Sequence, residues 1–434
     1  MTAPKRTWPL LSGRSRLVLL APLFVIAILA WWIASKTLQN YQMAINPDVQ
    51  LAEGSMGQDY SRNPHVNDDT QPGPQVGITL QTVADTVLWT SPRKGEIPLY
   101  RIPVLTYTPE GNLVAMVEGR RKPEGDTHPK IFSVRRSTDR GDTSCEMWSP
   151  AQRILYDKGI SSYLGTVFVD DTTRTVFLMY AYCEFCPLIS MMLMNSTDDG
   201  ITWGRPRNIT DMVGKDYAAY PGPGYGIQKK HEPAKGRLVV CGHGFHHGKG
   251  LVLLLSDDHG MTWRRGAFVP SIPFTNGTDG DFDPDECQLV ELPDGSLYVV
   301  ARNEKVYKQH CKIVMRSFDG GETLPQEHTY LDGALIEPRI TSGLWYHDGT
   351  LFYSGPKHDT KRRNLYIRWS YDHGKTWSSE KQIWADWAGY STLMMLPGDK
   401  SHLYIMYERG KTGPVDEIAL TKIKISMEQG REDT

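Results

Sequence analysis

Residues 256–263 read SDDHGMTW, and residues 370–377 read SYDHGKTW. Three further copies of this Ser-x-Asp-x-Gly-x-Thr pattern start at Ser137, Ser196 and Ser317. The intervals between the five starting serines are 59, 60, 61 and 53 residues, so the copies are almost evenly spaced along the chain. Because chance does not easily produce five evenly spaced copies, the pattern indicates a structural repeat.

Each copy has the composition of a turn between two strands. An apolar run such as 251–255 or 365–367 precedes it, its Asp can bond its own backbone, and its Gly tolerates a positive φ. The Thr-Trp pair can then begin the next strand, although the first copy delays its tryptophan to Trp148 and the fourth has Leu324. Repeats of this length are typical of propeller blades, and residues 83–425 would hold about six of them. The pattern therefore predicts an all-β fold, a six-bladed β-propeller.

The composition agrees with one large, turn-rich domain. The 434 residues are 40% hydrophobic and 23% charged, and they include 40 Gly and 28 Pro, which suits an all-β fold with a large core. The formal net charge is −2, so no overall basic field favours a nucleic-acid partner. Any site for an anion must therefore be a local one.

A separate signal lies at the N-terminus. Residues 1–16 are basic, and residues 17–34 form an uncharged apolar run, which is short for a transmembrane helix but longer than a usual signal-peptide core. A signal-anchor is favoured over a cleaved signal peptide because Trp31 and Trp32 spoil a small-residue cleavage site. The positive flank keeps the N-terminal end in the cytosol and sends the rest of the chain across the membrane.

The remaining segments follow from composition. Residues 35–82 are expected to form a stalk or linker, and residues 426–434 a polar tail without a tyrosine-based sorting signal. Glycosylation sequons begin at Asn195, Asn208 and Asn276, which agrees with a luminal or extracellular domain. The prediction is a membrane-bound protein of the cell surface or of the lysosome and endolysosomes.

The cysteines and acidic residues do not indicate a metal site. Six cysteines allow 15 disulfide connectivities in an oxidising lumen, and the Cys-x-x-Cys pair at 183–186 lacks the second pair of a structural zinc site. Acidic residues alternate at 279–286 as in a calcium loop, but Pro284 stands where an EF-hand requires Gly. A second alternative is metal binding by a histidine cluster in a Gly-rich loop, made of His243, His246 and His247. We expect neither a metal nor a cofactor.

Three arginines stand at strand-like positions in different repeats. Arg101 lies inside the apolar run LYRIPVL at 99–105, and Arg302 and Arg368 each follow an apolar run. A buried guanidinium is costly without a partner, so each arginine should face a carboxylate or an anionic ligand. The three side chains either converge at the propeller axis or are separately solvated, and their spacing alone does not decide between these arrangements.

The Arg-Ile-Pro strand at 101–103, together with the repeated boxes, resembles the exo-sialidase (neuraminidase) family, whose fold is a six-bladed propeller. The similarity runs from about residue 88 to about residue 425 and is more specific in several segments, which resemble the animal lysosomal sialidase. These segments are 218–224, 226–229, 235–244, 255–260, 285–288 and 291–295. The N-terminal 80 or so residues lie outside the resemblance.

The resemblance implies a substrate-binding set. Arg101, Arg302 and Arg368 match the arginine triad that clamps the carboxylate of sialic acid. Glu408 matches the carboxylate that orients Arg101. Planar, forked guanidinium groups suit a carboxylate better than the point charge of a lysine does.

The resemblance also implies a catalytic set. Asp126 matches the general acid/base, Tyr390 the nucleophile, and Glu286 the base that activates the tyrosine. Arg120 matches an additional substrate-site arginine, and the adjacent Arg121 is the alternative for that place. A neutral tyrosine hydroxyl approaches an anionic centre without the repulsion that a carboxylate nucleophile would meet.

The implied function is that of an exo-α-sialidase, which hydrolyses terminal sialic acids from glycoproteins, oligosaccharides and gangliosides by retaining double displacement. The partners implied are sialylated glycans, the membrane through the N-terminal segment, and a carboxypeptidase-type protective protein. Three alternatives stand beside it: a sialic acid lectin with a dead site, a propeller receptor for proteins, and a trans-glycosylating enzyme. The lectin would lack an acid, base or nucleophile, whereas all three residue types are present here.

Overall fold

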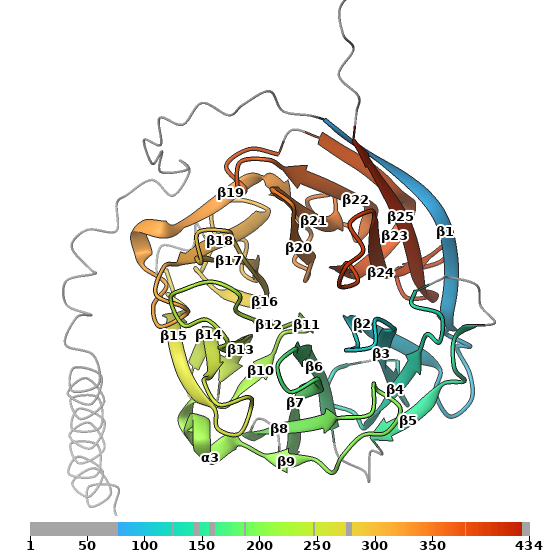
Figure 1. Cartoon of the computed structure of the whole chain (residues 1–434), viewed down its shortest axis with the longest axis horizontal. Coiled ribbons are helices and arrows are strands. Elements are labelled where there is room, and N and C mark those ends of the chain that lie inside the picture. Colours follow the sequence, from blue (N-terminus) through green and yellow to red (C-terminus); the bar gives the residue numbers. More distant parts are fainter. Residues whose placement is uncertain are drawn as a thin grey trace, which may run out of the picture. The chain divides into compact units, whose positions relative to one another are not determined.

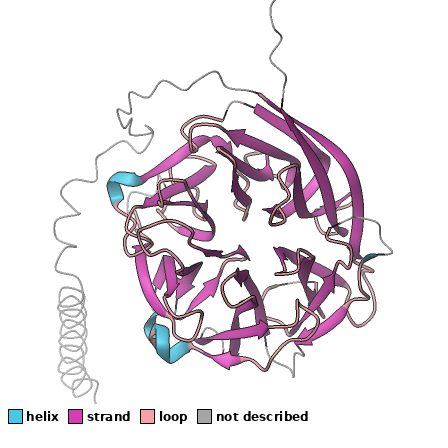
Figure 2. Ribbon diagram, viewed as in Figure 1, coloured by secondary structure: helices cyan, strands magenta, loops and turns pink. Residues whose placement is uncertain are grey.

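The computed structural model describes residues 77–123, 125–141, 147–155, 161–185, 188–245, 248–274, 280–377 and 379–427. Nearly all regular structure in these residues is β-strand (Figure 2). The helical elements are short: α3 (Thr210–Val213) and the 3-10 turns η2 (Lys215–Tyr217) and η3 (Gln326–His328). Within the described ranges, no helix has both the length and the apolar character that crossing a membrane requires. The anchor predicted at residues 17–34 lies outside these ranges.

Four sheets of four or five strands lie in a ring with one larger sheet (Figure 1). The first sheet contains β2 (Leu99–Tyr107), β3 (Leu113–Arg120), β4 (Lys130–Arg136) and β5 (Gln152–Leu155). The second contains β6 (Ser161–Asp170), β7 (Thr175–Phe185), β8 (Leu188–Ser196), β9 (Arg207–Asn208) and, parallel to β6, β11 (Gly224–Tyr225). The third contains β10 (Ala219–Pro221), β12 (Ile227–Gln228), β13 (Leu238–Phe245), β14 (Gly248–Ser256) and β15 (Arg264–Pro270). The fourth contains β16 (Pro284–Glu291), β17 (Leu297–Asn303), β18 (Cys311–Ser317) and β19 (Thr329–Ile336).

The larger sheet has seven strands and joins the two ends of the domain. Its strands are β20 (Gly343–His347), β21 (Thr350–Pro356), β22 (Arg363–Ser370), β23 (Ser379–Met394), β24 (His402–Gly410), β25 (Glu417–Met427) and β1 (Ile78–Thr90). β1 pairs with β25 from Ile78↔Met427 onward, so the first strand lies beside the last, and the predicted limits of 83 and 425 fall inside these two strands. The predicted all-β, propeller-like architecture is confirmed.

The repeated boxes form the turns that their sequence predicts. In the copy at 256–263, the Ser256 Oγ accepts a bond from the Gly260 backbone N–H at 2.9 Å. Asp258 accepts from the backbone N–H of Thr262 at 2.8 Å and from its hydroxyl at 2.6 Å. Trp263 is buried and packs edge-on against Phe168 of the second sheet, with ring centroids 5.6 Å apart. This box therefore closes a turn and packs its tryptophan against a neighbouring sheet. The boxes that start at Ser196, Ser317 and Ser370 make the same turn hydrogen bonds, whereas residues 142 and 143 of the first box lie outside the described ranges.

The boxes also fix the direction of the strands. They follow β4, β8, β14, β18 and β22, each the third strand of its unit along the hydrogen-bonded order of the sheet, with β12 lying off that order in the third sheet. Because neighbouring strands are antiparallel, the start of the first strand, the end of the second and the start of the third all lie at the same edge of the sheet. These three positions form the rim opposite the boxes. Side chains from that rim can meet at the centre of the ring.

Disulfides contribute to the framework. Cys241 of β13 is bonded to Cys287 of β16, with a Cα–Cα distance of 6.0 Å. Cys183 is also disulfide-bonded. Cys311 is buried and free. One link therefore joins the third sheet directly to the fourth.

Candidate active site

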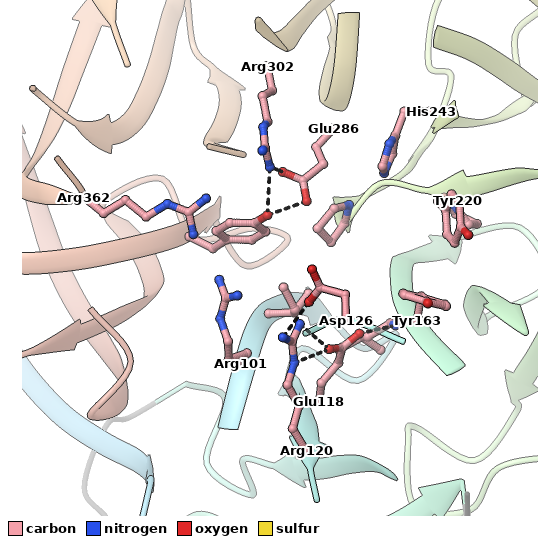
Figure 3. A pocket seen from close by; sticks show the side chains of 15 residues that line it. Arg101, Glu118, Arg120, Asp126, Tyr163, Tyr220, His243, Glu286, Arg302 and Arg362 are labelled. Carbon is pink, nitrogen blue, oxygen red and sulfur yellow. Dashed lines mark hydrogen bonds and ion pairs between the residues drawn. The ribbon is translucent and has the colours of Figure 1, made fainter. Parts of the chain in front are cut away.

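A cavity of about 310 Å³ opens at the centre of the rim opposite the boxes. Its walls include Arg101, Arg302 and Arg362, and Figure 3 shows Arg101 and Arg362 on one side with Tyr163 and Tyr220 on the other. The strands explain this convergence, because the lining residues come mostly from the starts of first strands, the ends of second strands and the segments that lead into third strands. The cavity thus collects side chains from every sheet of the ring.

Tyr390, Glu286 and Arg302 form one connected cluster in this cavity. The Tyr390 hydroxyl donates to Glu286 Oε1 at 2.5 Å, and Arg302 Nη1 donates to Glu286 Oε2 at 2.9 Å and to the Tyr390 hydroxyl at 3.3 Å. Burial, together with the Glu286 carboxylate, raises the pKa of Tyr390 well above its ordinary value. Both effects favour the neutral phenol, and its proton points to the Glu286 carboxylate.

Arg101 is held by a fully buried carboxylate. Its Nε donates to Glu408 Oε1 at 3.0 Å, and Glu408 also accepts from the backbone N–H groups of Ile102 and Tyr390 at 3.0 and 3.1 Å. Burial alone would raise the pKa of Glu408, but Arg101 overcomes this effect and lowers it. A Cβ at Gly389 would lie 2.0 Å from Glu408 Oε2, so only glycine fits there. Glu408 thereby joins the arginine strand to the tyrosine strand.

The Arg-Ile-Pro motif has a local conformation of its own. Ile102 has a φ of 58°, a left-handed conformation that is unusual for a β-branched residue. The pairing of β2 with β3 shifts register between Arg101 and Val104 at this point. Such strain costs about 1–3 kcal/mol and persists where the surroundings enforce it, here through the bond from Ile102 to Glu408. The irregular strand sets the place from which Arg101 enters the cavity.

Asp126 lies on the loop between β3 and β4, next to a second charged cluster. Arg120 Nη1 donates to Asp126 Oδ1 at 2.6 Å, and the Arg120 Nε donates to Glu118 Oε2 at 3.0 Å. Burial would raise the pKa of Asp126, but Arg120, Arg101 and Lys130 together lower it. Its carboxyl is exposed to the cavity mouth, with 68% of the side chain accessible. Arg121 instead pairs with Glu96 at 3.3 Å, so of the two adjacent arginines it is Arg120 that lines the cavity.

Arg368 does not reach the cavity, which corrects the predicted arginine triad. Its Nε lies 3.2 Å from Glu380 Oε2 of the neighbouring strand, near the end of β22 that carries a box. Arg362, six residues earlier, lines the cavity instead, with its guanidinium 5.4 Å from the centre of the Tyr390 ring. Six residues of extended strand span about 20 Å, so the two arginines belong to opposite rims.

The position of the box in its repeat is a sequence signal for Arg362. A third strand carries its box at its C-terminal end, so a cavity residue must precede the strand rather than end it. Arg362 directly precedes β22, whereas Arg368 stands two residues before the box serine Ser370. Among the described residues, Arg362 forms no ion pair, and its Nη2 donates to the Arg339 carbonyl at 3.1 Å. An unpaired guanidinium facing the cavity favours an anionic ligand.

The described ranges contain no group of three or more His, Cys, Asp and Glu side chains placed to hold a metal ion. His243 is instead paired with Asp285, with its Nδ1 2.8 Å from Asp285 Oδ1. Burial lowers the pKa of His243, but the Asp285 carboxylate overcomes this and raises it. Of the other residues considered for metal binding, those at 186, 246, 247 and 279 lie outside the described ranges.

Comparison with known proteins agrees with this arrangement. Residues 111–404 match the family described as BNR repeat-like domain. The sialidase of Micromonospora viridifaciens is 31% identical over 377 residues, which cover 78% of this chain and 54% of that protein. Human Sialidase-4 is 30% identical over 259 residues, which cover 51% of this chain and 49% of that protein.

The chain belongs to the sialidase family. Its fold is similar to that of a solved sialidase, Hadza microbial sialidase Hz136, with a TM-score of 0.62 at 24% identity over 75% of this chain and 66% of that one. The chain spans between about half and two thirds of the length of the first curated sialidases it matches. In this sialidase-family chain, the structure brings seven of the eight predicted site residues to one rim. These are Arg101, Arg120, Asp126, Glu286, Arg302, Tyr390 and Glu408.

Replacing the buried Glu408 by glutamine tests the support beneath Arg101. The variant leaves the Arg101 charge without its partner, so we expect the free energy of unfolding to fall by about 3 kcal/mol at neutral pH. Because the folded pKa of Glu408 is lowered, its stabilisation is present above the ordinary carboxyl pKa and is lost as the pH falls through the folded value. Chemical denaturation of both proteins from pH 7 to pH 3 should therefore show a difference that shrinks in acid.

Glu380→Gln is the matched control, because it alters a carboxylate whose side chain is 31% exposed and paired with Lys357 and Arg368 on the same sheet. This change should cost at most about 1 kcal/mol. Equal losses in the two variants would contradict a special role for Glu408.

Proposed function

We propose that this protein is an exo-α-sialidase, a hydrolase that removes terminal sialic acid from sialylated glycans. The observation that carries the proposal is the Tyr390 hydroxyl donating to Glu286 at 2.5 Å inside a cavity lined by four arginines. A neutral nucleophile with its base, next to cationic groups, suits a substrate whose reacting carbon bears a carboxylate. The names of the related sialidases support the same assignment.

In the proposed reaction, Arg101, Arg302 and Arg362 bind the substrate carboxylate. The bound sugar then places its anomeric carbon near Tyr390, and Glu286 accepts the phenol proton as the oxygen attacks. The same cationic side chains stabilise the negative charge that develops on the phenol oxygen, which offsets the raised pKa of Tyr390. A covalent tyrosyl intermediate forms and the aglycone leaves.

Asp126 completes the proposed cycle. It protonates the departing glycoside oxygen and then removes a proton from the water that cleaves the tyrosyl intermediate, so the product retains its anomeric configuration. The sialidase exception with a tyrosine nucleophile is a known variant of glycoside hydrolysis. When a substrate is bound, its carboxylate would partly cancel the positive charge of the arginines around Asp126. The smaller positive charge would favour the protonated form of Asp126.

We propose six blades for the ring. In this arrangement the seven-stranded sheet contains two blades, and the long strand β23 belongs to both. Its residues 379–387 pair with β22 of one blade, and its residues 387–394 pair with β24 of the next. The second unit would then be completed by β1, the N-terminal strand, which closes the ring. The N-terminal anchor at 17–34, ganglioside substrates, a protective protein partner and a lysosomal or surface location stay predictions from the sequence.

The direct test is release of sialic acid from a fluorogenic α-sialoside by the purified full-length chain between pH 4 and pH 7. Hydrolysis with an initial product of retained configuration, seen by proton NMR, is the expected result. Binding of a sialoside without release would support the lectin alternative instead. Transfer to an added acceptor sugar at the expense of hydrolysis would support trans-glycosylation.

Arg362→Ala should weaken substrate use strongly, whereas Arg368→Ala should not. A charge-assisted bond to the substrate carboxylate contributes about 1.5–3 kcal/mol, so kcat/KM should fall about 10²-fold in the first variant. Arg368 contacts Glu380 on a strand surface, so its removal should change kcat/KM by less than about twofold. Steady-state kinetics of the two purified variants separates them, and the reverse order would restore Arg368 to the triad.

A further inference from the structure

Glu286 lies in a β-bulge and therefore lacks regular ladder support. In the pairing of β16 with β17, Pro284 faces Asn303 and Cys287 faces Ala301, so two residues, Asp285 and Glu286, oppose Arg302 alone. A bulge re-aims side chains but leaves its extra residue without a regular partner. The position of the carboxylate that receives the Tyr390 proton must therefore be fixed by other contacts.

Two links from the neighbouring sheet reach the residues on either side of Glu286. Cys241 of β13 is bonded to Cys287, and His243 of the same strand is paired with Asp285 at 2.8 Å. On β13 the linked residues 241 and 243 are two apart, so both links can project from the same face of that strand; on β16 their partners lie in and just after the bulge. Glu286 stands between the two attachment points.

Asp285, the partner of His243, also contacts the backbone of Glu286. Asp285 Oδ1, which contacts His243 Nδ1, also accepts the backbone N–H of Glu286 at 2.7 Å. A continuous series of contacts then runs from His243 through Asp285 to Glu286 and on to the Tyr390 hydroxyl. A shift of the imidazole would thus be passed to the base through two hydrogen bonds.

The charges around His243 agree with a role in positioning. The groups that act on it are Asp285, Glu286 and Arg302, and its ring also lies 5.8 Å from that of Tyr220. Its side chain is 16% exposed and lines the cavity, but its Nδ1 is already engaged by Asp285. The imidazole can therefore stabilise the bulge through Asp285.

We propose that the disulfide Cys241–Cys287 and the pair His243–Asp285 form a clamp that positions Glu286 for proton transfer from Tyr390. His243 is a positioning residue in this arrangement, and it acts through Asp285. The clamp rests on the proposed sialidase function for its catalytic meaning. Its structural content, the place of Glu286 relative to Tyr390, is independent of that function.

The first experiment compares His243→Ala with His243→Asn in the full-length chain, using a fluorogenic α-sialoside. Asn keeps a donor near the place of Nδ1, so we expect it to retain most of the turnover, whereas Ala should lower kcat about 10- to 100-fold by misplacing the base. KM should stay within about twofold, because the arginines that bind the carboxylate are untouched. A raised KM with unchanged kcat would make His243 a substrate-binding residue and overturn the clamp.

A double-mutant cycle tests whether His243 acts through Asp285. The loss of kcat in His243→Ala with Asp285→Ala should be no larger than in Asp285→Ala alone, because both changes break one path. Additive losses would show that the two residues act separately. Circular dichroism melting of each variant establishes that the fold is retained under the assay conditions.

The contribution of the disulfide to the clamp is tested with the double variant Cys241→Ala with Cys287→Ala. We expect kcat to fall at nearly constant KM, whereas Cys311→Ala, which removes a buried thiol but breaks no disulfide, should leave kcat nearly unchanged. Equal kcat in the disulfide variant and the wild type would remove the disulfide from the clamp.

A structural readout separates failure of the clamp from failure of the proposed function. Crystal structures of the wild type and His243→Ala measure the distance between the Tyr390 hydroxyl and Glu286 directly. A lengthened distance supports the clamp even if neither protein hydrolyses sialosides. An unchanged distance overturns it whatever the activity, while an inactive wild type with an intact clamp counts against the function alone.

Discussion

Tyr390→Phe is expected to reduce the turnover of an α-sialoside by about 10⁴-fold or more, as loss of an attacking nucleophile commonly does. The phenyl ring keeps its place over Arg101 and near Arg362, whose guanidinium carbons lie 5.1 and 5.4 Å from the ring centre. Only the oxygen that donates to Glu286 is lost. Steady-state and single-turnover assays, with thermal melting to verify the fold, measure the effect.

Tyr220→Phe is the matched control for this variant. Tyr220 also lines the cavity, but its contacts are with the rings of Tyr163 and His243, and it lies opposite Arg101 and Arg362 (Figure 3). It should keep turnover within about tenfold of the wild type, because the nucleophile and its base are intact. Near-normal turnover in Tyr390→Phe would exclude the tyrosine as nucleophile.

Asp126→Ala is expected to lower kcat/KM about 10²–10⁴-fold for sialosides with sugar aglycones, which need protonation to leave. The loss should be much smaller for an aryl aglycone, because a phenolate departs without an acid. The neighbouring cationic groups lower the pKa of Asp126, so its titration lies at a more acidic pH than that of an ordinary carboxyl. The protonated fraction of Asp126 in the free enzyme therefore grows as the pH falls toward that value. Wild-type kcat/KM for sugar aglycones should therefore increase toward acidic pH.

The control for Asp126 is the pH profile of the alanine variant. Without the titrating carboxyl, this variant should lose the acidic rise for sugar aglycones while its use of the aryl substrate changes little with pH. Parallel losses on both substrates, with an unchanged pH profile, would assign Asp126 a binding role and leave the acid unidentified.

The site could be predicted from sequence where a residue's surroundings are encoded nearby. Arg101 stood in an apolar strand and so required a partner, and the structure supplies Glu408 from 307 residues away along the chain. The resemblance placed Glu286 and Tyr390 correctly in one cavity. Only the fold shows the bulge that turns Glu286 toward Tyr390, since register depends on pairing between strands.

The arginine triad shows where sequence reasoning failed. Arg362 and Arg368 belong to the same segment, and both follow the rule that an arginine near an apolar strand should find an anion. Which one lines the cavity depends on the direction of β22 and on the rim that its box occupies. The rim that each end of a strand occupies is a property of the assembled ring, so neither the apolar neighbours of Arg368 nor the resemblance placed that residue at the rim where the cavity lies.

The turn conformation of the boxes was determined by the sequence alone. Their hydrogen bonds join residues only a few positions apart, as between Asp258 and Thr262, and need no distant partner. Their even spacing then determined a repeated all-β fold. The disulfide was not determined in this way, because six cysteines allow 15 pairings and only spatial proximity selects Cys241 with Cys287. Short-range contacts are specified by the chain itself, whereas contacts between sheets exist only once packing has set the strands side by side.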